Sequence, residues 1–376
     1  MRQHYFAIAL IAAAVLTGCG GNGSSGGDQT LRTKFSAQVS FGDSLSDVGS
    51  YGVGTVKALG GGRFGINGDL TAVNPTLTGK NWTELMAAQI GVAAPCPAMT
   101  GLDGDATKGF SVPVVLHAGC FGYAQGGSRI TNPVGISNKL TGSALGALTV
   151  PVAAQIQNHL NVSGGKFSGT ELVLVMAGAN DALLSLTVMG NGATAAGTTA
   201  FGNTLVGLLA AGATSPQSAA QAIGLALQTE SARAGHTDAS VVAAAVGAAA
   251  VQPGNSAVGA PAVYGPMVAS AQAAGAKAGA DFAAAAGPGL VTMMATVATE
   301  LSTLVKTQLI AKGANYVVVN NLPDLGTTPF GKGLDANTLA LVNAMVKSFN
   351  DTLSAGLASE PKVAYVDTFA ASHDQA

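Results

Sequence analysis

Short apolar runs recur along the chain, and turn-forming or polar residues follow each of them. The four clearest runs are rich in β-branched and aliphatic residues and cover residues 38–41, 171–176, 315–319 and 362–366. Because runs of this length that are apolar on both faces are typical of buried parallel strands, they predict a parallel sheet. A weaker run at residues 119–124 predicts a fifth strand.

Helical spacing of apolar residues occurs between these runs. Residues 291–312 place Met294, Val297 and Leu301 on one face, and Gly313 follows as a favoured C-terminal cap. A further helix is predicted to begin at residue 81. Helices that alternate with parallel strands define a layered α/β fold.

Residues from about 190 to 290 form a segment that is rich in alanine and glycine and has few charges. It is long for a connection between two strands. Because alanine favours helix, the segment predicts short alanine-rich helices with breaks at Pro253-Gly254, Pro261, Pro266 and Gly287-Pro288. Two interpretations stay open, a structural or partly disordered insertion and a helical cap over a site.

Composition narrows the class of protein. Charged residues make up 10% of the 376 residues, where soluble domains usually carry about 25%. The net charge of −2 argues against nucleic-acid binding, which needs clustered lysine and arginine. A hydrophobic content of 48% excludes a disordered chain.

The N-terminus predicts export. A basic start is followed by an apolar run at residues 5–16, which is too short to span a bilayer and is typical of a secretory signal. The motif Leu16-Thr17-Gly18-Cys19 resembles the bacterial lipoprotein signal, in which the cysteine carries lipid. The alternative is an ordinary signal peptide with a chance cysteine.

On the lipoprotein interpretation, residues 1–18 are the signal peptide and residues 19–35 are a flexible Gly/Ser-rich tether. The protein would then lie at the outer membrane or cell surface and meet the membrane only through a lipid anchor at Cys19. A periplasmic or secreted protein is the alternative. Apart from the signal, no run looks apolar enough to span a membrane.

Cys96 and Cys120 would pair as one disulfide in an oxidising compartment, or they would be two buried thiols. No cluster of histidine, cysteine and acidic residues has metal-ligand spacing, and no glycine-rich dinucleotide loop is complete. We therefore expect neither a metal nor a cofactor.

The polar clusters fall at the carboxyl ends of the predicted strands, where α/β sheets bind ligands. The first cluster, GDSLSDVG at residues 42–49, resembles the first block of the GDSL (SGNH) superfamily of esterases and lipases. YAQGGS at residues 123–128 resembles the second block, and GAND at residues 178–181 matches the third. The segments NLPDLGTTP at residues 321–329 and Asn81-Trp82 are also similar to the family.

This resemblance implies a flavodoxin-like three-layer α/β sandwich with a central parallel five-stranded sheet, formed by residues 36–376 and carrying the alanine-rich helical insertion. It also implies a serine hydrolase that acts on small-molecule or lipid esters. Ser44 would be the nucleophile. The oxyanion hole would use the Ser44 N–H, the Gly127 N–H and the side-chain amide of Asn180, with Gly126 as the alternative glycine.

The sequence departs from the family pattern at the block that supplies the base of the catalytic triad. Relatives supply it from a DxxH block, and no aspartate stands three residues before His373. One interpretation is that the hydrolase domain is C-terminally incomplete. The rival is that His373 acts as the base, oriented by Asp367 or otherwise.

The remaining candidates are given structural roles. His117, His159 and His236 are expected to be surface or locally bonded residues, and Asp43 and Asp47 to shape the turn around Ser44. A different class of function also stays open, a catalytically inactive surface lipoprotein or fragment with this scaffold that binds carbohydrate or another partner.

Overall fold

A computed structural model describes residues 33–65 and 79–374 of the chain. They divide into two units, a sheet unit up to Leu184 and from Val291 onward, and a helical unit over Ser185–Leu290. The predicted signal peptide, Cys19 and nearly all of the predicted tether lie outside the described residues.

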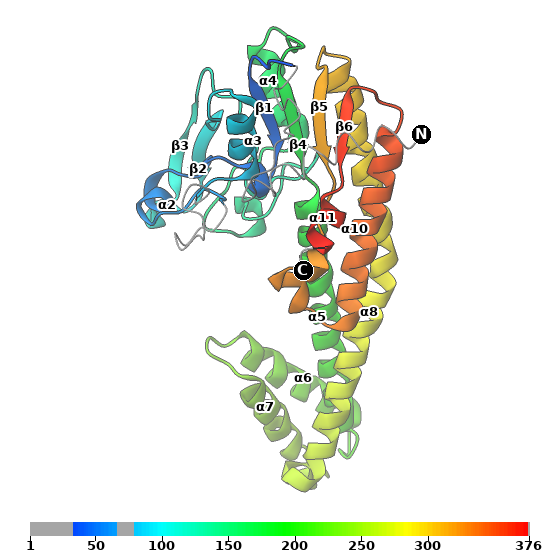
Figure 1. The fold of residues 1–376 in the computed structure, drawn as a ribbon. Helices are drawn as coiled ribbons and strands as arrows, with labels where there is room; N and C mark the ends of the chain where they lie inside the picture. The colour runs from blue at the N-terminus through cyan, green and yellow to red at the C-terminus, as the bar shows by residue number, and fades with distance from the viewer. Residues whose placement is uncertain (1–32, 66–78, 375–376) are drawn as a thin grey trace, which may run out of the picture. The chain divides into compact units, whose positions relative to one another are not determined.

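The sheet unit contains a parallel sheet in the order β1-β4-β5-β6 (Figure 1). Its strands are β1 (Gln38–Gly42), β4 (Leu172–Met176), β5 (Tyr316–Asn320) and β6 (Val363–Val366). All five residues of β1 and of β4 are buried, as their two-sided apolar pattern predicts. The four clear runs of the sequence are therefore strands, and the α/β class is confirmed.

The prediction of a fifth strand is wrong. Residues 121–125 do lie beside β1, where the Ser40 N–H donates to Phe121 O at 3.0 Å and the Tyr123 N–H donates to Ser40 O at 2.8 Å. Gly122 forms single parallel bridges with Ser40 on one side and with Pro97 on the other. We attribute the missing ladder to two features of this segment. It is short, and the residue that forms the bridge with β1 is a glycine, which weakens a strand.

Helices and a hairpin complete the sheet unit. Asn81 caps α3 with its side chain, which accepts from the backbone of Thr83 and Glu84 in a capping box. The antiparallel hairpin and the other elements are, in chain order, η1 (Ser44–Ser46), α2 (Gly54–Ala58), α3 (Trp82–Ile90), β2 (Met99–Asp103), η2 (Ala106–Lys108), β3 (Ser111–Leu116), η3 (Lys139–Thr141), α4 (Val152–Val162), η6 (Leu325–Thr327), α9 (Pro329–Lys332), α10 (Ala336–Leu357) and α11 (Thr368–His373).

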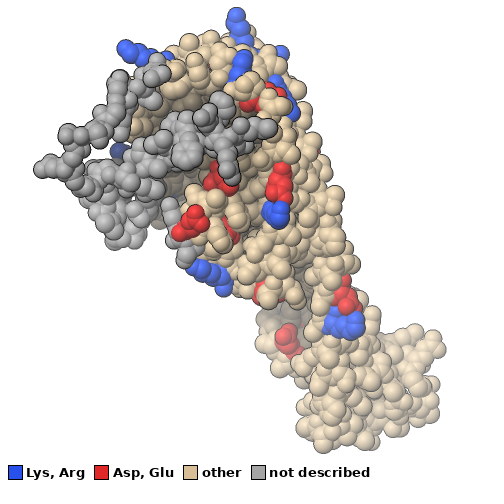
Figure 2. Space-filling model, turned by 45° about the vertical axis from the view of Figure 1, so that its right-hand side comes forward, with Lys and Arg blue, Asp and Glu red and all other residues tan. Residues whose placement is uncertain are grey.

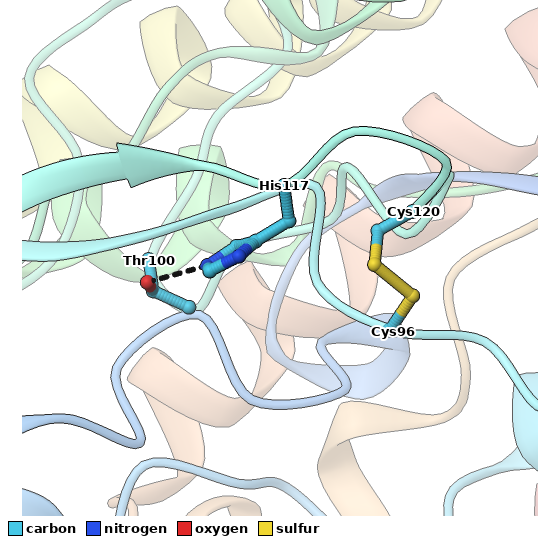
Figure 3. Close-up of a disulfide and its surroundings, with 4 residues drawn as sticks. All are labelled: Cys96, Thr100, His117 and Cys120. Atoms are coloured by element: carbon cyan, nitrogen blue, oxygen red, sulfur yellow. Dashed lines mark hydrogen bonds between the residues drawn. A yellow bond between two sulfur atoms is a disulfide. The ribbon is translucent and has the colours of Figure 1, made fainter.

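A disulfide joins Cys96 to Cys120 (Figure 3), so the bridged alternative of the sequence is confirmed. It encloses the β2–β3 hairpin. Next to it, the His117 ring nitrogen Nε2 lies 2.8 Å from Thr100 Oγ1, which ties the start of one hairpin strand to the end of the other. The disulfide therefore fixes the segment that leads into residues 121–125.

We expect replacement of both Cys96 and Cys120 by alanine to lower the free energy of unfolding by about 3 kcal/mol, because the closed loop restricts the unfolded chain. Urea denaturation of the wild type and the double variant measures this difference. Dithiothreitol should shift the wild-type curve toward that of the variant and leave the variant unchanged. Equal stability of the two oxidised proteins would contradict the prediction.

A buried histidine of α4 lies among aromatic rings. His159 is 2% exposed, its ring stacks on Phe167, and it meets Phe41 and Tyr123 edge-on. Its Nδ1 lies 3.3 Å from the Tyr123 hydroxyl. Burial lowers the pKa of His159 to about 4, with an opposing effect of the Glu171 charge. As the sequence predicts, this histidine is a structural residue.

His159 should make stability depend on pH. Between pH 6.5 and pH 4 the unfolded chain binds a proton at this histidine and the folded protein does not, so acidification through this window lowers the free energy of unfolding. The expected loss is up to about 1.4 kcal/mol per pH unit. Urea unfolding of the wild type and of His159→Gln across this range isolates the effect. Parallel pH profiles for the two proteins would refute it.

The helical unit differs from its sequence-based prediction in helix length. It contains most of α5 (Ala179–Ala210), then α6 (Pro216–Ala232), α7 (Asp238–Ala250), η4 (Ser256–Gly259) and most of α8 (Pro261–Leu304), which a π-helical turn (Val305–Ile310) extends. Pro261 starts α8 as predicted, but Pro266 and Pro288 lie inside that helix and do not break it. We attribute this to the strong helix propensity of the surrounding alanines, which carries the helix past each lost backbone hydrogen bond.

Glycines allow α5 and α8 to approach closely within the helical unit. A Cβ atom at Gly197 would lie 3.0 Å from the carbonyl oxygen of Gly275, and one at Gly279 would lie 3.1 Å from that of Ala193. Around this contact, a core forms from buried leucine, isoleucine and alanine side chains, including Leu205, Leu209, Ile223, Ala245 and Ala271. A few of the glycines in the helical unit thus serve helix packing.

Charges are sparse on the surface, and wide uncharged areas separate them on the face drawn in Figure 2. Several charges occur as neighbouring opposite pairs, such as Lys347–Asp351 and Lys277–Asp281. The helix Pro261–Ile310, with a mean hydropathy of 1.4 over its most apolar window, is long and apolar enough to cross a membrane by length and composition alone, contrary to the sequence-based expectation. Alanine raises that index although its side chain offers little apolar area.

Candidate active site

The carboxyl ends of β1 and β4 meet at a glycine. Gly42 has φ +151°, and a Cβ atom there would lie 2.1 Å from the Met176 carbonyl oxygen. The Asp43 N–H donates to that same oxygen at 3.3 Å. Glycine is required at this point, and the chain leaves β1 directly beside the end of β4.

Ser44 begins the 3-10 turn η1, immediately after the strand. Asp43 caps the turn, because its Oδ1 accepts from the Leu45 N–H at 3.1 Å. The Ser44 side chain is half-buried and makes no hydrogen bond to another described residue. The turn therefore places the serine at the carboxyl end of the sheet, as predicted.

Asp43 is buried directly before this serine. Burial raises the pKa of Asp43 to about 7, the charges of Asp181 and Asp47 add to the rise, and the Leu45 N–H opposes it. Asp43 thus caps the turn from a buried position. Its structural role in the turn agrees with the sequence prediction.

Asp47 connects the Ser44 turn to the second motif. One carboxylate oxygen, Oδ1, accepts from the Gly49 N–H at 2.8 Å and from the Ser50 N–H at 2.7 Å. The other, Oδ2, accepts from the Gly126 N–H at 2.8 Å. Burial raises the pKa of Asp47, and these three donors oppose that rise.

Gly126 and Gly127, the two alternatives for the glycine oxyanion donor, differ in whether their N–H group is already hydrogen-bonded. The Gly126 N–H is bound by Asp47, whereas the Gly127 N–H donates to no residue in the described ranges. Gly127 has φ +81°, and a Cβ atom there would lie 2.2 Å from the Ile136 carbonyl oxygen. Only glycine fits this position, and its N–H is the one left available.

Asn180 stands in the first turn of α5, after β4. Its Nδ2 donates to the Ser128 carbonyl oxygen at 2.9 Å, which uses one of the two N–H groups of the amide. Its neighbour Asp181 accepts from Arg129 Nε at 2.8 Å and from the Ile130 N–H at 3.2 Å. The third motif thus holds the segment that follows Gly127.

The segment around residues 81–84 supports the same turn. Asn81 Nδ2 donates to the Asp47 carbonyl oxygen at 3.1 Å, and Trp82 Nε1 donates to Ser46 Oγ at 3.1 Å. All the sequence motifs up to residue 181 are therefore joined by hydrogen bonds around the turn that carries Ser44.

His373 has a carboxylate partner that the sequence analysis did not name. Its Nδ1 lies 2.6 Å from Asp324 Oδ2, and this hydrogen bond raises the pKa of His373. Asp367 does not orient it: Asp367 Oδ1 accepts from the Ala370 N–H and from Asn321 Nδ2. The only signal for Asp324 was its place in the polar segment after β5.

The remaining candidates have local roles. His236 Nδ1 lies 2.9 Å from the Arg233 carbonyl oxygen, and His117 pairs with Thr100 as described above. Among the described residues, no group of three or more histidine, cysteine or acidic side chains could hold a metal ion.

In comparisons with known proteins, no family model and no curated protein matches the chain.

Proposed function

We propose that the protein is a serine hydrolase that acts on ester bonds, with Ser44 as the nucleophile. The Ser44 N–H, the Gly127 N–H and the Asn180 amide would donate to the oxyanion. The observation that carries this proposal is the hydrogen-bond network that joins the three motifs. Asp47 and Asn180 bind the two sides of the turn that holds Gly127, and that turn leaves one glycine N–H available.

In the proposed reaction, Ser44 Oγ attacks the ester carbonyl carbon, and the carbonyl oxygen gains negative charge in the tetrahedral intermediate. Collapse expels the alcohol and leaves an acyl-enzyme, which water hydrolyses. The reaction needs a base to take the serine proton. In the described part of the chain, His373 is the one histidine hydrogen-bonded to a carboxylate, as a triad base is.

The resemblance to GDSL esterases supports small-molecule or lipid esters as substrates and a flavodoxin-like three-layer sandwich as the scaffold. The Cys96–Cys120 disulfide supports the exported location that goes with it, because disulfides persist in oxidising compartments. Cys19 would carry the lipid anchor.

A fluorophosphonate probe tests the proposal. Ser44 Oγ should attack phosphorus, fluoride should leave, and the serine proton should pass to the base, so that a stable phosphonyl ester forms. Peptide mass mapping should then locate the adduct on Ser44. Heat-denatured protein is the control and should stay unlabelled. Failure of the folded protein to react would favour the inactive binding scaffold.

A further inference from the structure

The available glycine N–H belongs to the peptide unit between Gly126 and Gly127. A peptide unit is planar and trans, so the Gly126 carbonyl and the Gly127 N–H point in opposite directions from one rigid plane. A group that holds the Gly126 carbonyl oxygen therefore also sets the direction of the Gly127 N–H.

Tyr51 holds that carbonyl. Its hydroxyl donates to the Gly126 oxygen at 2.8 Å, and it accepts from the Thr149 N–H at 3.1 Å. The side chain is 4% exposed. Burial raises the pKa of Tyr51 far above its ordinary value, with the Asp47 charge adding to the rise and the Thr149 N–H opposing it. The hydroxyl thus stays protonated, with its donor direction set by its acceptor bond.

The same glycine is held from its other side. Asp47 binds the Gly126 N–H, which belongs to the preceding peptide unit. The Tyr51 ring also packs against Gly126, because a Cβ atom there would lie 3.2 Å from the ring and 2.6 Å from the ring of Phe64. Rotation of the Gly126–Gly127 peptide would have to break the bond to Tyr51.

We propose that Tyr51 is a positioning residue, which aims the Gly127 N–H at the oxyanion through the Gly126 carbonyl. This inference rests on the proposed function. Tyr51 follows Ser44 by seven residues, so one short segment would align both the nucleophile and the backbone donor.

Tyr51→Phe tests the proposal, because it removes the hydroxyl and keeps the ring. We expect kcat for p-nitrophenyl ester hydrolysis to fall roughly 10- to 100-fold, since misdirection of one donor weakens transition-state binding. KM should change by less than about threefold, because the ground-state carbonyl depends little on the donor. Affinity for a trifluoromethyl ketone, which forms a tetrahedral oxyanion on the serine, should fall by the same factor as kcat.

Tyr123→Phe is the matched control. Tyr123 is also buried. It begins the second motif, but its hydroxyl contacts His159 and none of the proposed oxyanion donors. Both variants lose one buried hydroxyl, and thermal denaturation measures the stability cost of each loss. Only Tyr51→Phe should lose kcat and inhibitor affinity.

The outcomes separate this inference from the proposed function. If the wild type is labelled at Ser44 and the two tyrosine variants have equal kcat, the role of Tyr51 is overturned and the hydrolase proposal stands. If the wild type neither reacts with the fluorophosphonate nor hydrolyses esters, both fall. A loss of kcat in Tyr51→Phe without a matching loss of inhibitor affinity would also overturn the positioning role.

Discussion

Ester hydrolysis by Ser44→Ala is expected to be at least about 10⁴-fold slower than by the wild type, because the other hydroxyl of the turn, that of Ser46, is fully buried and hydrogen-bonded to Trp82. The variant should fold normally, since the Ser44 side chain makes no hydrogen bond to another described residue. Initial rates with p-nitrophenyl butyrate measure the loss of hydrolysis, and fluorophosphonate labelling measures the loss of the reactive serine.

Ser46→Ala provides the control from the same turn. Ser46 is fully buried, and its hydroxyl accepts from Trp82 Nε1. Its removal should lower stability by about 1 kcal/mol and leave the labelling of Ser44 in place. Full hydrolysis by Ser44→Ala would end the proposal that this serine is the nucleophile.

Asn180→Ala should have the second largest effect on catalysis. Loss of one oxyanion donor typically lowers kcat by ~10²–10³-fold. KM should stay nearly constant, because the donor acts mainly on the charge of the transition state. Steady-state kinetics with the same ester measure both constants.

Asn158→Ala, a half-buried asparagine on α4, is the control for loss of an amide outside the candidate site. Asn180 also holds the Ser128 carbonyl, so the melting temperature of each variant must be measured alongside its kinetics. If Asn180→Ala melts earlier and keeps its kcat, the amide is only a structural anchor.

Local patterns predicted the parts of the fold that depend on neighbouring residues. Runs such as residues 171–176 have to be buried on both sides, so their apolar pattern reveals the strands. Asn81 reveals a helix start because its capping bonds lie within three residues. Residues 119–124 misled the same reasoning, because their apolar content resembles a strand while their pairing with β1 is limited to one bridge, at Gly122.

The predicted site residues could be placed at strand ends from the sequence, but only the family resemblance, and no local pattern, favoured Gly127 over Gly126. That choice depends on the Asp47 carboxylate, which lies 79 residues away along the chain. Asp324 and His373 are 49 residues apart, and nothing in either local sequence indicates the other. Such pairs depend on strand order, which local patterns do not encode.

The antiparallel contact of α5 and α8 has a consequence for folding. β4 pairs with β5 through Leu172 and Tyr316, and the long intervening chain makes this pairing costly in loop-closure entropy. Within the helical unit, Gly192 meets Phe282 and Gly197 meets Gly275, so the two helices bring distant parts of the chain together through contacts internal to that unit. Early formation of this helix pair would shorten the effective loop, and we therefore expect it to precede and accelerate closure of the parallel sheet.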